Sequence, residues 1–488
     1  MPRNKLIGLL LGPILFLLVW VFFQAEGFST EARAVLGITC WIACWWVSEA
    51  VPIPITSLLP LSLFPIMGVM SIKAVAQPYI SPIIFLFIGG FILALALEKW
   101  NLHRRIALSI ILRVGTRSRL IVLGFMLATA LLSMWISNTA TTMMMVPIAM
   151  AIVFQLELMQ GKGSGKDESG KLGKVLVMAI AFSASIGGLG TLVGTPTTLI
   201  MVGYIEEVYH QSLDFANWMM YGIPLVVILI PIVWLHLTRI VFPLSDVEIE
   251  GGKAEIQRQL DELGPMSREE KWVLGVFGMV AIAWIFRSYL LAPLIPGIHD
   301  TIIALVGATL LFIIPERTPG KTLMDWETAS RLPWGILLLF GGAFAVAAGF
   351  ESSGLVSWIA GKLGQLEALG LLLIMLIIVA FVNYLTEIVQ NMATCTLMLP
   401  VLAALAPALD VHPYILMVPM CVASSCAFML PFATAPNAIA FGSGYLEMKD
   451  MIRAGFWLNF ISVIIIVFYS YLALGELWDL QISPHPGW

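Results

Sequence analysis

Apolar segments of about 20 residues follow one another along almost the whole of this sequence. A helix of about that length crosses the hydrocarbon core of a bilayer, which is about 30 Å thick. Only 11% of the residues are charged and the mean hydropathy is +0.94, values outside the usual range of soluble domains. We therefore predict an all-α polytopic protein of the cell (inner) membrane, without a soluble domain.

The hydropathy pattern predicts about 11 transmembrane helices. They cover residues 6–24, 32–48, 51–70, 80–98, 172–203, 216–242, 271–290, 299–315, 333–350, 412–444 and 450–475. Two further apolar regions, 119–158 and 369–406, are interrupted by polar clusters around Asn138 and Asn391. We expect each region to form a re-entrant hairpin or two short spans, and both alternatives return the chain to the side that it left.

The distribution of basic residues predicts which loops lie in the cytoplasm. With a cytoplasmic N-terminus, 22 of the 26 Lys and Arg residues fall in inner loops, as the positive-inside rule requires. The same topology assigns residues 1–29 to the N-terminal helix, residues 243–270 to a cytoplasmic connector and residues 476–488 to an external C-terminal tail.

Matching motifs occur in the same order on both sides of this connector. The sequence FIGG at 87–90 matches LFGG at 339–342, and NTATTMMMVP at 138–147 matches NMATCTLMLP at 391–400. A third pair is GTPTTLI, beginning at Gly194, and ATAPNAI, beginning at Ala433. Each half holds five predicted spans, an odd number, so the two copies must have opposite orientations in the membrane.

We therefore predict two inverted-topology repeats, residues 30–242 and 271–475. Each repeat would contain scaffold helices, one hairpin and one broken helix. The breaks are expected near 194–198 and 433–437, where Thr195-Pro196 and Thr434-Ala435-Pro436 interrupt the apolar pattern.

The interrupted segments carry the polar chemistry of the chain. Broken helices persist at membrane depth where protein or a water-filled cavity satisfies their backbone groups. Helix N-termini offer N–H groups to an anion, and helix C-termini offer carbonyl oxygens to a cation. The side chains at the breaks are hydroxyls and amides that suit sodium, namely Ser133, Ser137, Asn138, Thr139, Thr195, Thr386, Asn391 and Thr434.

Other classes of function fit the sequence less well. The histidines and cysteines are scattered without metal-ligand spacing, and neither a nucleophile motif nor a nucleotide-binding loop occurs, so we do not expect an enzyme or an organic cofactor. A net charge of −4 does not favour a nucleic-acid partner. A cation/proton antiporter would need a carboxylate at the crossing point, and Glu387 is the candidate nearest to a break.

The motifs SNTAT at 137–141, TEIVQN at 386–391 and the two Thr/Pro breaks resemble those of the divalent-anion/sodium symporter (DASS, INDY-type) family. The resemblance covers about residues 30–475. It implies scaffold and transport domains, a homodimer, an elevator mechanism and co-transported sodium ions. It also implies small anionic substrates such as succinate, malate, citrate and sulfate.

Carried over by position, the resemblance also implies site residues. The first sodium site would comprise Ser133, Ser137, Asn138 and the backbone at Gly194, and the second Thr386, Asn391 and the backbone at Val389 and Ala433. The anion site would comprise residues from both tips and both breaks: Ser137, Asn138, Thr139, Thr195, Pro196, Gln390, Asn391, Met392 and Thr434.

This sequence departs from the family pattern at the second tip. It reads Gln390-Asn391-Met392 where the family has Ser-Asn-Thr, and Ala435 replaces the first proline of the second break. Loss of two hydroxyls changes one end of the anion site. We expect sodium-coupled symport of small di- or multivalent anions, with C4-dicarboxylates first. Symport of sulfate or another compact anion, and sodium-independent anion exchange, are the alternatives.

Overall fold

The computed structural model describes residues 3–160, 166–211, 213–246, 248, 251–363 and 370–478. Residue 369 of the second predicted hairpin and residues 479–488 of the predicted external tail lie outside these ranges. The described chain is mainly helical. Its extended pairings are two isolated bridges, Arg117 with Glu248 and Pro315 with Thr322. The expectation of an all-α fold is confirmed.

Nine helices of the described part are long and apolar enough to cross a membrane. They are α1 (Arg3–Phe22), α6 (Pro82–Lys99), α9 (Asn138–Gln160), α10 (Lys166–Gly187), α12 (Phe215–Leu235), α14 (Arg268–Phe286), α17 (Trp334–Ser352), α20 (Asn391–Ala408) and α23 (Met448–Leu477). Shorter apolar helices lie between them, so the chain is a multi-pass membrane protein.

The predicted span 51–70 is not one continuous helix, because two short helices occupy this segment. They are α3 (Ile53–Thr56) and α4 (Leu59–Ile66). Prolines stand at 52, 54, 60 and 65, and each removes a backbone donor and restricts the turn before it. A single continuous helix therefore does not form here.

The loops between the spans contain helices that hydropathy did not predict. Helix α7 (Leu102–Val114) follows α6, and α13 (Gly252–Glu262) lies in the connector and packs against α7 and α9. The guanidinium of Arg105 pairs with Glu270 at 3.0 Å and donates to the carbonyls of Leu263 and Gly264. The charged connector is thereby bound to the membrane-spanning part.

Both interrupted regions form pairs of helices that meet at a short polar tip. In the first, α8 (Ser118–Ser133) meets α9, and in the second, α19 (Leu371–Leu385) meets α20. The ends of these helices agree within a few residues with the predicted regions 119–158 and 369–406. Asn138 and Asn391 are the first residues of α9 and α20.

Two helices are broken, as expected, but the prolines stand at the start of the second piece and do not end the first. Helix α10 continues through a 3₁₀ turn to Gly190, and α11 (Pro196–Tyr209) begins at the proline. Likewise α21 (Pro413–Ser425) ends well before α22 (Ala435–Gly442). Proline suits the first turn of a helix, where its missing N–H would have no intrahelical partner.

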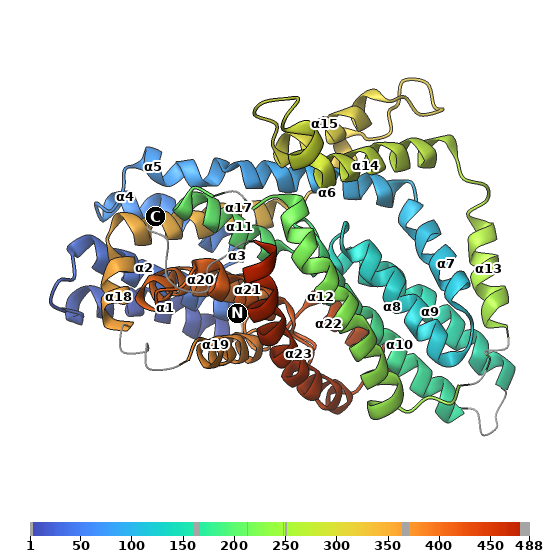
Figure 1. Cartoon of the computed structure of the whole chain (residues 1–488). Helices are drawn as coiled ribbons and strands as arrows, with labels where there is room; N and C mark the ends of the chain where they lie inside the picture. The colour runs from blue at the N-terminus through green and yellow to red at the C-terminus, as the bar shows by residue number, and fades with distance from the viewer. Residues whose placement is uncertain are drawn as a thin grey trace.

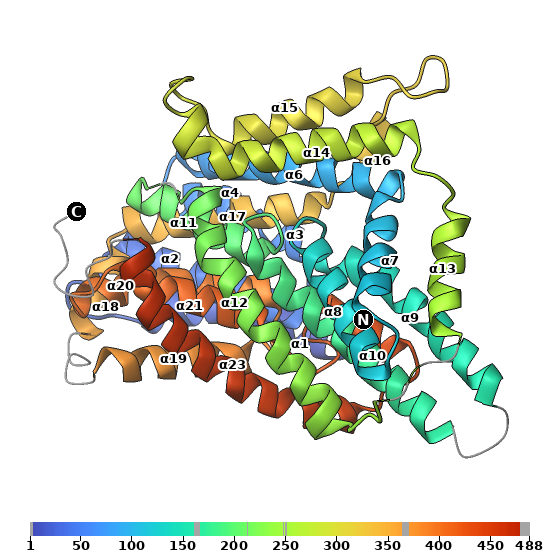
Figure 2. The same ribbon diagram turned by 45° about the vertical axis from the view of Figure 1, so that its right-hand side comes forward.

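The two halves interlock through these elements. Helix α11 of the first half packs against α20 of the second, and α22 of the second packs against α9 of the first. Figures 1 and 2 show α14, α15 (Asp300–Ile313) and α6 together along one side of the molecule. Helices α1 and α2 (Thr30–Ser48) pack against each other at some distance from that group.

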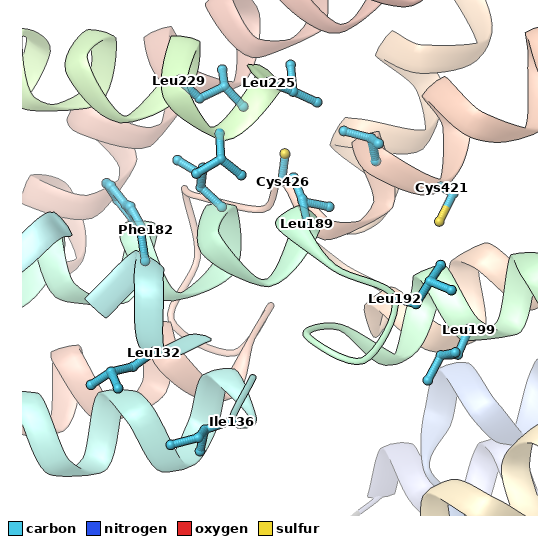
Figure 3. Close-up of a cluster of buried hydrophobic side chains, with 14 of the residues drawn as sticks. Leu132, Ile136, Phe182, Leu189, Leu192, Leu199, Leu225, Leu229, Cys421 and Cys426 are labelled. Atoms are coloured by element: carbon cyan, nitrogen blue, oxygen red, sulfur yellow. The ribbon is translucent and has the colours of Figure 1, made fainter. Parts of the chain in front are cut away.

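The main apolar core surrounds the breaks. Figure 3 shows side chains from the end of α8, from α10, from the link between α10 and α11, from α12 and from α21. Leu189, Leu192 and Cys426 belong to this core and are almost completely buried. Close van der Waals packing of these side chains helps to hold the irregular backbone at a fixed position, since lipid is as apolar as they are.

Candidate functional site

A cavity of about 410 Å³ lies where both polar tips and both breaks meet. Ser137, Asn138 and Thr139 come from the first tip, and Gln390, Asn391 and Met392 from the second. The breaks add Gly194, Thr195, Pro196, Ala433 and Thr434. Segments about 250 residues apart in the sequence therefore form one site.

A cluster of oxygen atoms lies behind the first tip. The Ser133 hydroxyl is fully buried, 2.6 Å from Asn138 Oδ1 and 2.7 Å from the carbonyl oxygen of Ala184. The same terminal atom of the Asn138 side chain lies 3.1 Å from the Ala184 carbonyl and 3.2 Å from that of Gly194. Turned one way, the amide donates to these oxygens. Turned the other way, its oxygen joins them to form an oxygen-only cluster.

The second tip repeats this arrangement. The Thr386 hydroxyl is fully buried and lies 2.7 Å from Asn391 Oδ1 and 2.8 Å from the carbonyl oxygen of Ser424. In both halves a hydroxyl at the end of the first helix of the pair contacts the asparagine that opens the second. In both halves it also contacts a carbonyl near the end of the first piece of the broken helix.

Two glycines allow the first cluster to form. A Cβ atom at Gly188 would lie 2.6 Å from Asn138 Oδ1 and 3.0 Å from the Gly194 carbonyl oxygen. A Cβ atom at Gly194 would lie 2.4 Å from the Gly188 carbonyl oxygen and 2.9 Å from that of Ser133. Real Cβ atoms do not approach oxygen so closely, so the close approach of backbone to asparagine requires glycine at both positions.

The structure brings most of the predicted site residues to the cavity. There are three exceptions. Ser133 and Thr386 lie in the oxygen clusters behind the tips, and Val389 belongs neither to the cavity lining nor to an oxygen cluster. Sequence reasoning missed the Ala184 and Ser424 carbonyls. Backbone oxygens carry no residue signature, although each of these residues precedes a break by only a few positions.

Apolar side chains form the rest of the cavity wall. They include Phe87, Phe91, Ile336, Ile388 and Phe432. Trp46 of α2 also lines the cavity and is almost completely buried. The site therefore combines polar ends with an apolar middle.

Further polar residues line the site. Within the described residues, the Ser185 hydroxyl and Gln390 Oε1 are buried without a hydrogen-bond partner, and both residues line the cavity. The hydroxyl of Thr197, another lining residue, lies 2.6 Å from the Ser425 hydroxyl. A buried polar atom without a hydrogen-bond partner is costly, so the Ser185 hydroxyl and the Gln390 amide oxygen are polar groups whose partners the described protein atoms do not supply.

A second cavity, of about 500 Å³, adjoins the first and shares Glu49, Ile336, Gln390 and Met392 with it. It extends to Lys5, whose ammonium nitrogen lies 4.0 Å from the Glu49 carboxylate. Among the described residues that line the two cavities, Lys5 is the one cation and Glu49 the one carboxylate. The second cavity thus links the site to the start of α1.

The model of the sodium:sulfate symporter transmembrane region matches residues 3–478 of this chain. The chain belongs to the sodium:sulfate symporter family. The family resemblance seen in the tip and break motifs is therefore confirmed, and the chain is a membrane transporter.

Similar proteins include the sodium-dependent dicarboxylate transporters SdcS of two staphylococci. The protein from Staphylococcus saprophyticus is 44% identical over 484 residues, which cover 98% of this chain and 93% of the relative. The protein from Staphylococcus aureus (strain NCTC 8325) is 45% identical with the same coverage.

Solved structures share the fold at low sequence identity. MtrF of Neisseria gonorrhoeae, from a class of antimetabolite efflux pumps, has a TM-score of 0.61 at 13% identity and covers 100% of this chain and 97% of its own. The YdaH transporter of Alcanivorax borkumensis has a TM-score of 0.61 at 15% identity and covers 97% of this chain and 98% of its own. At such identities the likeness concerns the fold alone.

Proposed function

We propose that this family member couples the transport of a C4-dicarboxylate to sodium. The proposal rests mainly on where Asn138 and Asn391 lie, because each contributes to two sites. Each asparagine lines the central cavity, and each also belongs to a buried oxygen cluster behind its tip. The names of the staphylococcal relatives agree with this assignment.

The two oxygen clusters are the proposed sodium sites. Sodium prefers oxygen ligands, and hydroxyl, amide and carbonyl oxygens meet in both clusters. The first site would use Ser133, Asn138 and the carbonyls of Ala184 and Gly194. The second would use Thr386, Asn391 and the carbonyl of Ser424. We keep Ser137 with the first site, and Val389 and Ala433 with the second, as proposed contributors.

The cavity between the clusters is the proposed anion site. Polar groups of the first tip would hold one carboxylate, and Asn391, Gln390 and Thr434 the other. Met392 and Pro196 would contact the substrate at its sides. The apolar wall at Phe87, Phe91 and Ile336 matches the methylene carbons of a dicarboxylate, which sulfate lacks.

Sodium would make anion binding favourable for an electrostatic reason. Among the described residues, the central cavity has no cationic lining residue, and Lys5 lines the second cavity that adjoins it. A dianion between the tips therefore depends on bound sodium for charge balance. Since each asparagine touches both sites, sodium would also orient the amides that face the anion. The resulting coupling is reciprocal.

The basic loops support a cytoplasmic N-terminus and an external C-terminus. In that orientation the cavity opens toward the cytoplasm, because its extension reaches Lys5 near the start of α1. We include a homodimer and an elevator motion of a transport domain along a scaffold in the proposal, as the family resemblance implies.

One set of contacts would have to break in such a motion. Arg287, just beyond α14, lies 2.8 Å from Asp300 at the start of α15 and 3.5 Å from Asp214, which caps α12. The Asp300 carboxylate also accepts the N–H of Phe215 at 3.0 Å. These contacts join α12, which packs on the broken helix α10, to the α14–α15 pair.

The proposal is tested by uptake in proteoliposomes with sodium, lithium or potassium, crossed with succinate, citrate, sulfate and phosphate. We expect succinate uptake in sodium and not in potassium. Asn138→Ala and Asn391→Ala should each abolish coupled uptake while the protein remains folded in detergent. Equal succinate uptake in potassium would overturn the coupling.

Two alternatives give different results in the same system. Sulfate symport, which the family description suggests, would appear as sodium-dependent sulfate uptake that excess succinate fails to compete. Sodium-independent exchange would appear as strong stimulation of uptake by internal anion without any sodium gradient.

A further inference from the structure

Glu387 is a buried carboxylate beside the second tip, next in sequence to Thr386. Its side chain is 2% exposed and does not line the cavity. Oε1 accepts the N–H groups of Phe428 at 2.7 Å and Met429 at 2.8 Å, and Oε2 accepts that of Leu430 at 2.9 Å. Three successive backbone N–H groups that converge on one carboxylate form an anion-binding nest.

A fourth donor comes from another helix. The side-chain amide of Asn459 in α23 donates to Glu387 Oε1 at 2.7 Å. All four donors are uncharged, and within the described residues Glu387 has no cationic partner. The negative charge of the carboxylate is therefore held by neutral dipoles and not neutralised by an ion pair.

The nest is part of the break between α21 and α22, which other side chains also hold. Asn383 donates to the Cys426 carbonyl at 2.7 Å, and Asn437 donates to the carbonyls of Ala427 at 3.0 Å and Leu430 at 3.1 Å. The same stretch of chain, from Ser424 onward, supplies the carbonyl that contacts Thr386. The geometry of the second oxygen cluster thus depends on the segment that Glu387 holds.

Among the described residues of the first half, uncharged groups hold the corresponding break. Met134 occupies the position that corresponds to Glu387, since Ser133 corresponds to Thr386. The Thr191 hydroxyl donates to the Met134 carbonyl, and the indole N–H of Trp218 donates to the Leu189 carbonyl at 2.9 Å. The two halves therefore make matching oxygen clusters but differ by one buried negative charge.

We propose that Glu387 is a positioning residue that makes the two sodium sites unequal, with the second site binding sodium more tightly and filling first. This inference rests on the proposed sodium sites. The fixed carboxylate holds the α21–α22 break around the second oxygen cluster and adds a negative potential there. A poorly screened charge in the protein interior acts on its neighbours more strongly than one at the surface.

The test measures sodium binding to the full-length protein in detergent without substrate, from the rise in unfolding temperature across a sodium titration. We expect Glu387→Gln to weaken apparent sodium affinity by about tenfold, which corresponds to about 1.4 kcal/mol. Glu387→Asp, which keeps the charge, should retain more of the affinity. Glu98→Gln is the matched control, because Glu98 is a half-buried carboxylate at the end of α6 that lines neither cavity.

A double-mutant cycle separates an effect on the second site from a general loss of stability. Thr386→Ala should weaken sodium binding less in the Glu387→Gln background than in the wild type, because both changes act on one site. The effect of Ser133→Ala should be the same in both backgrounds. The proposal would be overturned if Glu387→Gln left the effects of both Thr386→Ala and Ser133→Ala on sodium affinity unchanged.

The sodium response also distinguishes this inference from the proposed function. If Glu387→Gln lowers the unfolding temperature without sodium but leaves the sodium midpoint unchanged, Glu387 is merely structural and the inference is wrong, while sodium coupling stands. If the wild type itself shows neither sodium stabilisation nor sodium-dependent uptake, the proposed function fails and the inference fails with it.

Discussion

Replacing Gly188 by alanine tests whether the first oxygen cluster binds sodium. The new Cβ would lie 2.6 Å from Asn138 Oδ1 and 3.0 Å from the Gly194 carbonyl oxygen, so at least one of these groups must move. The Asn138 side chain is the group with rotatable bonds, and its rotation would take its oxygen out of the cluster. Overpacking at a buried position costs about 1 to 3 kcal/mol.

That cost would fall mainly on the sodium-bound state, in which the amide must be in place. We therefore expect the sodium concentration for half-maximal succinate uptake to rise by about five- to 150-fold. The unfolding temperature without sodium should change much less. Gly275→Ala is the matched control, because its Cβ would have nothing within 4 Å and it lies in the outer helix α14.

Uptake in proteoliposomes over a range of sodium concentrations, at saturating succinate, gives the sodium concentration for half-maximal uptake directly. Sodium-dependent protection against thermal unfolding in detergent gives a second sodium midpoint that does not depend on transport. If Gly188→Ala folds normally and its sodium midpoint stays within about twofold of that of Gly275→Ala, the first cluster is not a sodium site.

Three further predictions concern the second tip, the Arg287 contacts and the cavity mouth. Changing Gln390→Ser together with Met392→Thr restores two hydroxyls worth about 0.5 to 1.5 kcal/mol each, so succinate affinity should rise by roughly tenfold relative to sulfate affinity. Competition with labelled succinate at saturating sodium measures this ratio. An unchanged order of anion preference would show that the second tip does not determine specificity. Arg287→Met should destabilise the protein by about 3 to 5 kcal/mol because it leaves buried carboxylates unpaired. Adding Asp300→Asn should restore part of the lost unfolding temperature. If the double variant unfolds at the same temperature as Arg287→Met, loss of this ion pair is not the cause of the destabilisation. Lys5→Gln should raise the KM for succinate by up to about fivefold at low ionic strength, since an exposed pair contributes up to about 1 kcal/mol. The difference in KM should vanish at high salt. A salt-independent difference would contradict electrostatic attraction of succinate by Lys5.

Patterns within short stretches of sequence determined the membrane architecture. About 20 apolar residues in a row form a spanning helix wherever they occur, because the bilayer replaces water as their solvent. The interruptions at Asn138 and Asn391 were predictable for a related reason, since polar residues at membrane depth require a special environment. The segment 51–70 shows a limit of hydropathy, because its four prolines divide the predicted helix into two short ones.

The tertiary structure alone decided which atoms complete the site. Ser133 contacts the Ala184 carbonyl 51 residues away, and Thr386 contacts that of Ser424 38 residues away. The sequence pointed to Glu387 as a carboxylate near a break, but only the fold shows that it binds the N–H groups of Phe428 to Leu430. Every residue other than proline carries the same backbone N–H and carbonyl, so these partners leave no mark on residue identity. Their positions follow from the packing of whole helices against one another.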